Sequence, residues 1–332
     1  MAVNKDSITK AFHAFNHQNI LVIGDVMLDV YIQGEVNRIS PEAPVPVLHV
    51  SHEEQRIGGA ANVALNLRSL GAKPILCSII GNDKDGGSFS ALLKENDISG
   101  EGVIIDENRI TTVKTRAISH NQQLLRIDRE KNEYIEQDLA DKLYRKISEI
   151  ISQKQIAGII FQDYDKGILT PSLIHMVIQL ARSWQIPTFV DPKKRNFHHY
   201  RQVTVFKPNF KEFREGLGVM LENTETGSII DVAQKYLNSS ENKVLLLTLS
   251  EKGVIVADKH SGQHIPARIR DIADVSGAGD TVISTASLCY INHLSLWEMA
   301  YVSNIAGGLV CQKPGVVAVN KQELLDEVIQ EG

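Results

Sequence analysis

The sequence predicts an α/β protein with three layers, in which helices cover both faces of a mainly parallel sheet and a small β-sheet lid stands beside it. Three observations lead to this prediction. Short apolar, β-branched runs alternate along the chain with longer segments of helical period. Strands separated by helices favour parallel pairing, and a parallel sheet needs cover on both faces. Two segments break the alternation, and we expect them to leave the main sheet.

The expected strands of the main sheet are short and mostly apolar. Gly24 ends the first strand and Asp191 closes a later one. Runs of this length and composition indicate strands that are buried on both faces. We place them at residues 20–23, 74–80, 156–161, 188–190, 203–206 and 244–248.

The expected helices show an apolar stripe together with residues that start or stop a helix. Val63, Leu67 and Leu70 share one face of a helix that stops at Gly71. Another helix begins at Pro171, a residue that suits the first helical turn. We place helices at residues 62–70, 89–95, 138–151, 171–184, 278–290 and 296–310.

The two segments that break the alternation of strands and helices are predicted to form the lid. Residues 26–50 contain β-type residues and three prolines but no helical period, and residues 111–128 alternate like a hairpin that turns near 119–121. We expect one domain over residues 1–332, with a lid made of about 26–50 and 109–128 inside it. A lid beside a parallel sheet suits a site that must exclude water.

Composition limits the classes of partner. The chain has 35 Lys and Arg against 40 Asp and Glu, a net charge of −5, so it offers no general field for nucleic acid or for an anionic membrane. Cys77, Cys289 and Cys311 are far apart without metal-ligand spacing, which favours reduced thiols and a cytoplasmic protein. We recognise no signal peptide and no apolar run of about 20 residues.

The most informative segment is DVSGAGDT, residues 274–281, which opens a helix. Gly277, Ala278 and Gly279 let backbone N–H groups point into one space at the positive end of the helix dipole, which suits a phosphate. Asp280 would lie in the first helical turn, where a carboxylate can accept a proton from an attacking hydroxyl. The alternative is that Asp280 is only an acid favoured at a helix start. Walker-A, dinucleotide-binding, zinc-protease and serine-hydrolase motifs are absent from the sequence.

Two segments far apart in the chain resemble the signatures of the ribokinase/PfkB family of carbohydrate kinases. GGAANVA at residues 58–64 is similar to its N-terminal di-glycine signature, and residues 274–281 are similar to its C-terminal signature. The resemblance covers nearly the whole chain. It implies a ribokinase-like fold, a phosphotransferase activity on a sugar hydroxyl, and the use of ATP and Mg²⁺; it leaves a requirement for a monovalent cation open.

Shorter matches narrow the resemblance to kinases of heptose 7-phosphate, which act in the synthesis of ADP-heptose for lipopolysaccharide. In that branch the kinase is joined to an adenylyltransferase with an H-x-G-H motif. This sequence ends at Gly332 without such a motif, so we expect a separate adenylyltransferase in the same pathway. The matching segments are GDVMLD at 24–29, RISPEAPVPV at 38–47, NQQLLR at 121–126, DYDKG at 163–167 and DPK at 191–193.

The resemblance implies a role for each matched position. Asp280 is the base and Gly277, Ala278 and Gly279 are its anion hole. Gly58 and Gly59 form the lid hinge, and Asp29 and Asn62 hold sugar hydroxyls. The nucleotide phosphates lie near Asn209 and near Glu212, which also acts on Mg²⁺ indirectly. The remaining nucleotide positions are Thr248, Ser250 and Gly253 for the ribose, and Asn304 and Gly308 for the adenine.

A phosphate group on the substrate needs positively charged side chains to bind it, and we select candidates by their positions in the predicted elements. Arg116 lies on the lid hairpin, and Lys166 and Lys193 follow strand ends, so these three are the candidates. Gln123 is a candidate for a sugar hydroxyl. Simpler interpretations stay open: solvated charges for the cations, a polar turn for Gln123, a turn for the two glycines, and a helix-start residue for Asn62. For Asn209 with Glu212 the alternative is a capping box.

Three positions depart from the heptose-kinase pattern: Val30, Gln162 and Lys207, where we expect a basic residue, a serine and a small polar residue. These departures leave the exact sugar open. We therefore keep two other readings, another sugar or nucleoside kinase of the same family, and a sugar sensor without catalysis. Open strand edges in the lid lead us to expect a homodimer that pairs through it.

Overall fold

A computed structural model describes residues 4–120, 122–221, 226–268 and 270–331. Its main sheet has nine strands in the order β13-β12-β11-β10-β9-β8-β1-β4-β5. Pairing is parallel from β11 to β5, and only β12 and β13 are antiparallel, so the predicted mainly parallel sheet is confirmed. The strands are β1 Asn19–Gly24, β4 Lys73–Gly81, β5 Ser99–Asp106, β8 Ile156–Gln162, β9 Thr188–Asp191, β10 Val205–Phe206, β11 Val244–Thr248, β12 Val254–Ala257 and β13 Gly262–Ile265.

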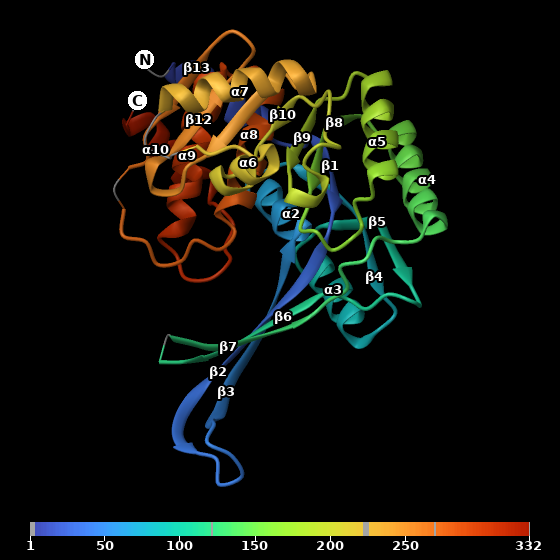
Figure 1. The fold of residues 1–332 in the computed structure, drawn as a ribbon, viewed down its shortest axis with the longest axis vertical. Helices are drawn as coiled ribbons and strands as arrows, with labels where there is room; N and C mark the ends of the chain where they lie inside the picture. The colour runs from blue at the N-terminus through green and yellow to red at the C-terminus, as the bar shows by residue number, and fades with distance from the viewer. Residues whose placement is uncertain (1–3, 121, 222–225, 269, 332) are drawn as a thin grey trace.

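Helices cover both faces of this sheet (Figure 1). In β1, Ile20 and Val22 pack into one core, and Leu21 and Ile23 pack into the other, because successive side chains of a strand point to opposite faces. The first core includes residues of α1, α2, α8, α9 and α10, and the second includes residues of α4, α5 and α7. The helices are α1 Lys5–Ala14, α2 Ala60–Ser69, α3 Lys84–Glu95, α4 Gln137–Gln153, α5 Pro171–Ser183, α6 Phe210–Leu217, α7 Thr226–Ser240, α8 Ala278–Ile291, α9 Leu296–Cys311 and α10 Lys321–Glu331.

A second, four-stranded sheet has the order β3-β2-β6-β7 and projects from the body as a long twisted arm (Figure 1). Its strands are β2 Val26–Ile39, β3 Pro46–Gly59, β6 Val113–Ser119 and β7 Gln122–Arg129. The first hairpin extends further than predicted, to Gly59 rather than residue 50, and β3 therefore ends at the start of α2. Asn121, in the predicted turn of the second hairpin, lies outside the described residues.

Some elements were not predicted, for identifiable reasons. α3 begins at Lys84, where the Asp83 side chain accepts a hydrogen bond from Gly86 N, and the glycine pair Gly86-Gly87 had hidden this first turn. Strand β10 begins at Val205 rather than residue 203. Also unpredicted are β5, β12, β13, α1, α6, α7 and α10, which are short or only partly apolar.

Candidate active site

The start of α8 is built around Gly277. Its φ is +81°, a left-handed conformation that side chains rarely adopt, and a Cβ there would lie 2.9 Å from Asn62 Nδ2. Ala278 then begins the helix, so free backbone N–H groups of its first turn, near Gly279, carry the positive end of the dipole. Ala278 N donates to the backbone oxygen of Val275 at 3.3 Å, and an anion hole at residues 277–279 stays a prediction.

Asp280 lies in this first turn and is only 3% exposed. Asn62 Nδ2 donates to its Oδ2 at 2.7 Å, while Gln162 Nε2 and the Tyr164 hydroxyl donate to its Oδ1 at 2.9 and 2.8 Å. The donors come from α2, from the end of β8 and from the segment after β8. The sequence predicted Asn62 as a site residue. Gln162 was noted only as a departure from the heptose-kinase pattern, and Tyr164 was given no role.

Small residues let α8 approach α2 closely enough for this contact. Ser284 of α8 donates to the backbone oxygen of Val63 at 3.2 Å, and Thr281 donates to Asn66 Oδ1 at 2.9 Å. Larger side chains at these positions would separate the helices and remove Asn62 from Asp280. These contacts account for the small side chains of Thr281 and Ser284 in α8.

A buried ion pair lies next to the helix start. Lys207 Nζ is 3.0 Å from Asp191 Oδ2, and both side chains are less than 10% exposed. A Cβ on Gly279 would lie 3.5 Å from that Nζ and 3.6 Å from that Oδ2, so the pair lies beside the first turn of α8. Lys207 can supply positive charge to a phosphoryl group there. The available sequence signal was a lysine directly after an apolar strand.

Burial raises the pKa of Asp280 to about 7. The negative charge of Asp191 adds to the increase, while the hydrogen bonds from Asn62 and Tyr164 and the charge of Lys207 oppose it. A carboxylate with this pKa is partly ionised near neutral pH and is basic enough to accept a proton efficiently.

The lid brings Asp29 and Arg116 together. They lie on the neighbouring strands β2 and β6, and Arg116 Nη1 is 2.5 Å from Asp29 Oδ1. Gly58 makes room for this pair, because a Cβ there would lie 2.1 Å from Asp29 Oδ2. Gly59 has φ +62°, and a Cβ there would lie 2.4 Å from the backbone oxygen of Asp25. The two glycines thus lie at the junction of lid and body, and not in a surface turn.

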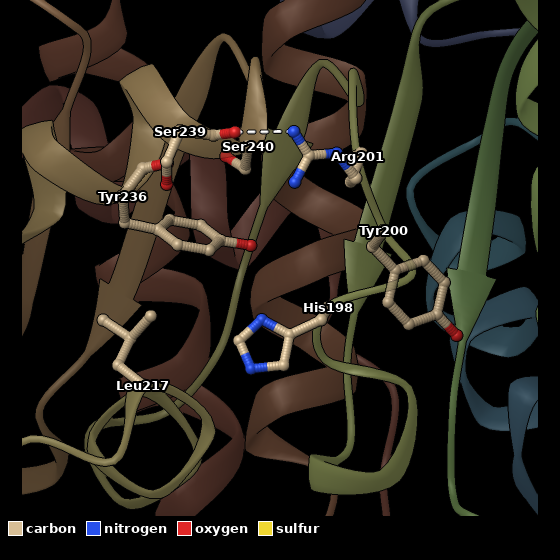
Figure 2. Close-up of a pocket in the computed structure, with 7 residues that line it drawn as sticks. All are labelled: His198, Tyr200, Arg201, Leu217, Tyr236, Ser239 and Ser240. Carbon is tan, nitrogen blue, oxygen red and sulfur yellow. Dashed lines mark hydrogen bonds between the residues drawn. The ribbon is translucent and has the colours of Figure 1, made fainter.

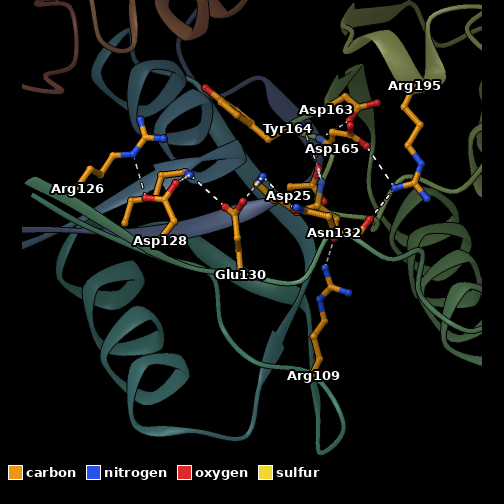
Figure 3. Close-up of polar contacts among 12 residues, drawn as sticks. Asp25, Arg109, Arg126, Asp128, Glu130, Asn132, Asp163, Tyr164, Asp165 and Arg195 are labelled. Carbon is orange, nitrogen blue, oxygen red and sulfur yellow. Dashed lines mark hydrogen bonds and ion pairs between the residues drawn. The ribbon is translucent and has the colours of Figure 1, made fainter.

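The cations predicted for a substrate phosphate already have carboxylate partners. Besides Arg116 with Asp29, Lys166 Nζ lies 2.9 Å from Glu130 Oε1, and Lys193 contacts Glu212. Figure 3 shows Glu130 within a chain of polar contacts that runs from the lid to the segment after β8. Burial lowers the pKa of Lys193, but Asp191 and Glu212 outweigh this effect and leave it above its usual value. Gln123 lies on β7, which is exposed along its length.

Asn209 and Glu212 form a capping box at the start of α6. Asn209 Oδ1 accepts from Glu212 N at 2.8 Å, and Glu212 Oε2 accepts from Asn209 N at 2.9 Å. Glu212 Oε1 is the atom that contacts Lys193. The helix-capping alternative is therefore present in the structure, and a contact of these residues with a nucleotide stays a prediction.

The other predicted nucleotide positions are found in two places, at the end of β11 with the turn after it and on α9. Thr248 ends β11, and Ser250 and Gly253 have positive φ in the turn that follows it. Asn304 and Gly308 lie one turn apart on α9, where Asn304 Nδ2 donates to the backbone oxygen of Pro266 at 2.9 Å.

Comparison with known proteins decides the family. The model of the pfkB family carbohydrate kinases matches residues 17–323. The chain belongs to the pfkB family of carbohydrate kinases. It is therefore a phosphotransferase that acts on a sugar hydroxyl, as predicted.

Similar curated proteins carry the name "Bifunctional protein HldE". This kinase is 38% identical to the one from Magnetococcus marinus, over an alignment that covers 94% of this chain and 64% of that protein. It is 37% identical to one from Helicobacter pylori, over 92% of this chain and 65% of that protein, and 39% identical to one from Haemophilus ducreyi, over 93% and 63%. The chain thus spans less than two thirds of the length of these relatives.

Solved structures confirm the ribokinase-like fold. Escherichia coli phosphofructokinase-2 in complex with potassium has a TM-score of 0.76 at 18% identity, covering 95% of this chain and 99% of that one. Arabidopsis thaliana ribokinase complexed with ribose and ATP has a TM-score of 0.71 at 16% identity, covering 96% and 100%.

PfkB kinases use ATP and typically Mg²⁺, and the residues present fit a metal that arrives on the nucleotide. Within the described residues, no three or more His, Cys, Asp or Glu side chains gather as a metal-binding group. Mg²⁺ on nucleotide phosphates commonly needs only one or two protein carboxylates and keeps several waters. Both oxygens of Glu212 have partners within the protein, and an indirect contact of Glu212 with Mg²⁺ stays a prediction.

A small cavity lies apart from this site. A cavity of about 70 Å³ is lined by residues of which none is a predicted site residue, namely His198, Tyr200, Arg201, Leu217, Tyr236, Ser239 and Ser240 (Figure 2). It is much smaller than the roughly 300–1,000 Å³ of usual ligand pockets. In the part of the chain that the structure describes, every helix is too short or too polar to cross a membrane.

Proposed function

We propose that this kinase transfers the γ-phosphoryl group of ATP to the anomeric hydroxyl of D-glycero-D-manno-heptose 7-phosphate and forms the 1,7-bisphosphate. The main support is the buried carboxylate of Asp280 in the first turn of a glycine-started helix, with Lys207 beside it. Such an arrangement provides a base for a hydroxyl and positive charge for a phosphoryl group within one space. The choice of heptose rests on the sequence segments that resemble heptose 7-phosphate kinases.

In this mechanism ATP lies across the carboxyl ends of the parallel strands, where open α/β sheets bind ligands. Asp280 removes the proton of the anomeric hydroxyl, and the oxygen attacks the γ-phosphorus in line while the bond from that phosphorus to the β,γ-bridging oxygen breaks and ADP leaves. The N–H groups of residues 277–279 and the Lys207 ammonium receive the charge that spreads over the phosphoryl oxygens. Bound Mg²⁺ would neutralise charge on the nucleotide phosphates, with Glu212 contacting it through water.

The sugar would lie between the lid and the body. Asp29 would accept hydrogen bonds from its hydroxyls, while Arg116, Lys166 and Lys193 would exchange part of their carboxylate contacts for the 7-phosphate. The Oε1 atom of Gln162 is buried without a hydrogen-bond partner among the described residues. A donor on the sugar would satisfy this acceptor.

The test is a coupled ADP-release assay over heptose 7-phosphate, fructose 6-phosphate, ribose and adenosine. We expect kcat/KM to be highest for heptose 7-phosphate, and abolished in Asp280→Asn. Higher activity with ribose or adenosine would replace this proposal with another kinase of the same family. Sugar binding by calorimetry without ADP release from any substrate would indicate the sensor.

We also propose a homodimer that pairs through the lid. Every residue of the edge strand β7 is exposed, and Leu124, Leu125 and Ile127 are 42%, 56% and 55% exposed. An unpaired edge with apolar side chains favours association with a second copy. Small-angle scattering that gives the mass of one chain at micromolar concentration would contradict it.

A cytoplasmic location and a separate adenylyltransferase that uses the product complete the proposal. The location follows from the need for ATP and from the free cysteines, of which Cys77 and Cys289 are buried thiols. Co-purification of the native protein with an adenylyltransferase activity on a separate chain is the measurement for the second point.

A further inference from the structure

The segment after β8 contains Tyr164, whose hydroxyl reaches the candidate base. It donates to Asp280 Oδ1 at 2.8 Å, the same oxygen that accepts from Gln162 at 2.9 Å. A carboxylate oxygen has two lone pairs. These two donors therefore occupy Oδ1 fully. Oδ2 accepts only from Asn62 among the described residues, so one of its lone pairs stays free.

Tyr164 is held in place by a buried carboxylate beneath it. Asp25, which directly follows β1, is 1% exposed and accepts three backbone hydrogen bonds from this segment, from Tyr164 N at 2.9 Å and from Lys166 N and Ile168 N at 3.1 Å. Figure 3 shows Asp25 directly below Tyr164 and Asp165 in this network. One side chain thus fixes the path of five consecutive residues, 164–168.

The conformation of the segment requires such support. Asp165 has φ +58° and Gly167 has φ +88°, and a Cβ at Gly167 would lie 1.9 Å from the backbone oxygen of Glu133. Asp163, also 1% exposed, accepts from Asp165 N and from the side chains of Asn196 and Tyr200 at 2.8–2.9 Å. A backbone held in left-handed conformations by buried carboxylates is costly. The cost is understandable if the position of Tyr164 matters for function.

We propose that Asp25 and Tyr164 are positioning residues for the base, with Asp25 fixing the segment so that Tyr164 and Gln162 occupy Oδ1 of Asp280 and leave Oδ2 to take the proton from the acceptor hydroxyl. This inference rests on the proposed kinase function. It gives a role to the Asp-Tyr-Asp-Lys-Gly motif, which the reaction as described above does not use except at Lys166.

The pH dependence of the reaction reports on this arrangement. The groups that face Asp280 are Asn62 from α2, Gln162 at the end of β8, Tyr164 after β8, Asp191 at the end of β9, Lys193 after β9, and Lys207 after β10. The hydrogen bond from Tyr164 lowers the pKa of Asp280. Its removal in Tyr164→Phe should raise that pKa, and the acid limb of kcat/KM should move to higher pH by about one unit.

The first experiment compares Tyr164→Phe with Tyr134→Phe. Tyr134 is a matched control, because its hydroxyl donates to Asn196 Oδ1 at 2.8 Å and does not contact the base. We expect Tyr164→Phe to lower kcat about tenfold at pH 7 and to shift the acid limb, while Tyr134→Phe keeps both. A Tyr164→Phe enzyme with an unchanged acid limb and kcat overturns the proposal.

A second measurement does not depend on turnover. The pKa of Asp280 is read by ¹³C NMR of the carboxyl groups in labelled protein, with Asp280→Asn to assign the signal. We expect a higher pKa in Tyr164→Phe than in the wild type. An unchanged pKa refutes the contact whether or not the protein phosphorylates a sugar, whereas a wild type without sugar kinase activity, but with the shifted signal, refutes only the proposed function.

The role of Asp25 is tested by a double-mutant cycle. If Asp25 acts through Tyr164, adding Asp25→Asn to Tyr164→Phe should lower kcat by less than Asp25→Asn does in the wild type. Additive effects would show that Asp25 acts separately. Should Asp25→Asn not fold, Asp25→Glu replaces it in the same cycle, because it keeps the charge but displaces the carboxylate. Wild-type kcat and acid limb in a folded Asp25→Glu enzyme would then also overturn the role of Asp25.

Discussion

Replacement of Asp280 by Asn should abolish turnover and, at the same time, change how stability depends on pH. The amide cannot accept the proton of the hydroxyl, and loss of a general base typically costs about 10²–10⁴-fold in rate. The variant keeps the size of the side chain and the start of α8. We therefore expect ATP and sugar binding to persist while kcat falls by at least 100-fold.

The stability effect follows from the pKa of the buried carboxyl group. Burial raises the pKa of Asp280 from 3.8 to about 7, a shift of roughly three units, and each unit corresponds to about 1.4 kcal/mol. Between these two values the folded state holds a proton that the unfolded state has released. The free energy of unfolding of the wild type therefore falls by about 4 kcal/mol from pH 4 to pH 8, relative to a side chain that does not titrate.

The assay is guanidinium unfolding of wild type and Asp280→Asn at several pH values between 5 and 8. The difference in unfolding free energy should move in favour of the variant as pH rises and level off above about 7. Hydrogen-bond differences between acid and amide add a constant and leave this trend unchanged. Parallel pH curves for the two proteins would refute the buried, perturbed carboxyl group, and retained turnover would refute its role as the base.

Three further substitutions test the surroundings of the site. Arg116→Ala leaves the buried Asp29 without its partner, and it should lower the free energy of unfolding by about 3 kcal/mol and raise the KM for sugar. The control Arg126→Ala breaks a more exposed ion pair and should lower the free energy of unfolding by less than about 1 kcal/mol. Equal losses in the two variants would contradict the assignment. Gly277→Ala should lower kcat more than tenfold, because its Cβ would meet Asn62, whereas Gly227→Ala in α7 has open space and should keep wild-type kinetics. Lys207→Met should lower kcat about 100-fold and move the acid limb to higher pH, since Lys207 lowers the pKa of Asp280; wild-type kinetics would show that Lys207 is only structural.

The local patterns of the sequence predicted much of the fold. The helix predicted at 62–70 is α2 Ala60–Ser69, and the strand predicted at 156–161 is β8 Ile156–Gln162. Both depend on a hydrophobic period that short stretches of chain express by themselves. The antiparallel β12 and β13 were not predicted, and in β13 only Ile265 is buried, so that strand shows no apolar run.

The candidate site likewise combines features that are local in the sequence with contacts between distant segments. Glycines beside an acid at a helix start are a local arrangement, so Gly277, Gly279 and Asp280 could be found from the chain alone. The predicted phosphate cations were named one by one, and the sequence could not show that each has a carboxylate partner. Such partners lie on other strands and become neighbours only when the sheets form.

By itself, the sequence determined the α/β class, the glycine-started helix with its acid, and the membership of a carbohydrate kinase family, because these depend on residues close together or on matched motifs. The tertiary structure decided that Gln162, Tyr164 and Lys207 surround Asp280, and that Asp25 supports Tyr164. These residues end or follow strands β8, β10 and β1, whose carboxyl ends lie at one edge of the sheet. Parallel pairing of strands far apart in the chain is a long-range event, and no local pattern records it.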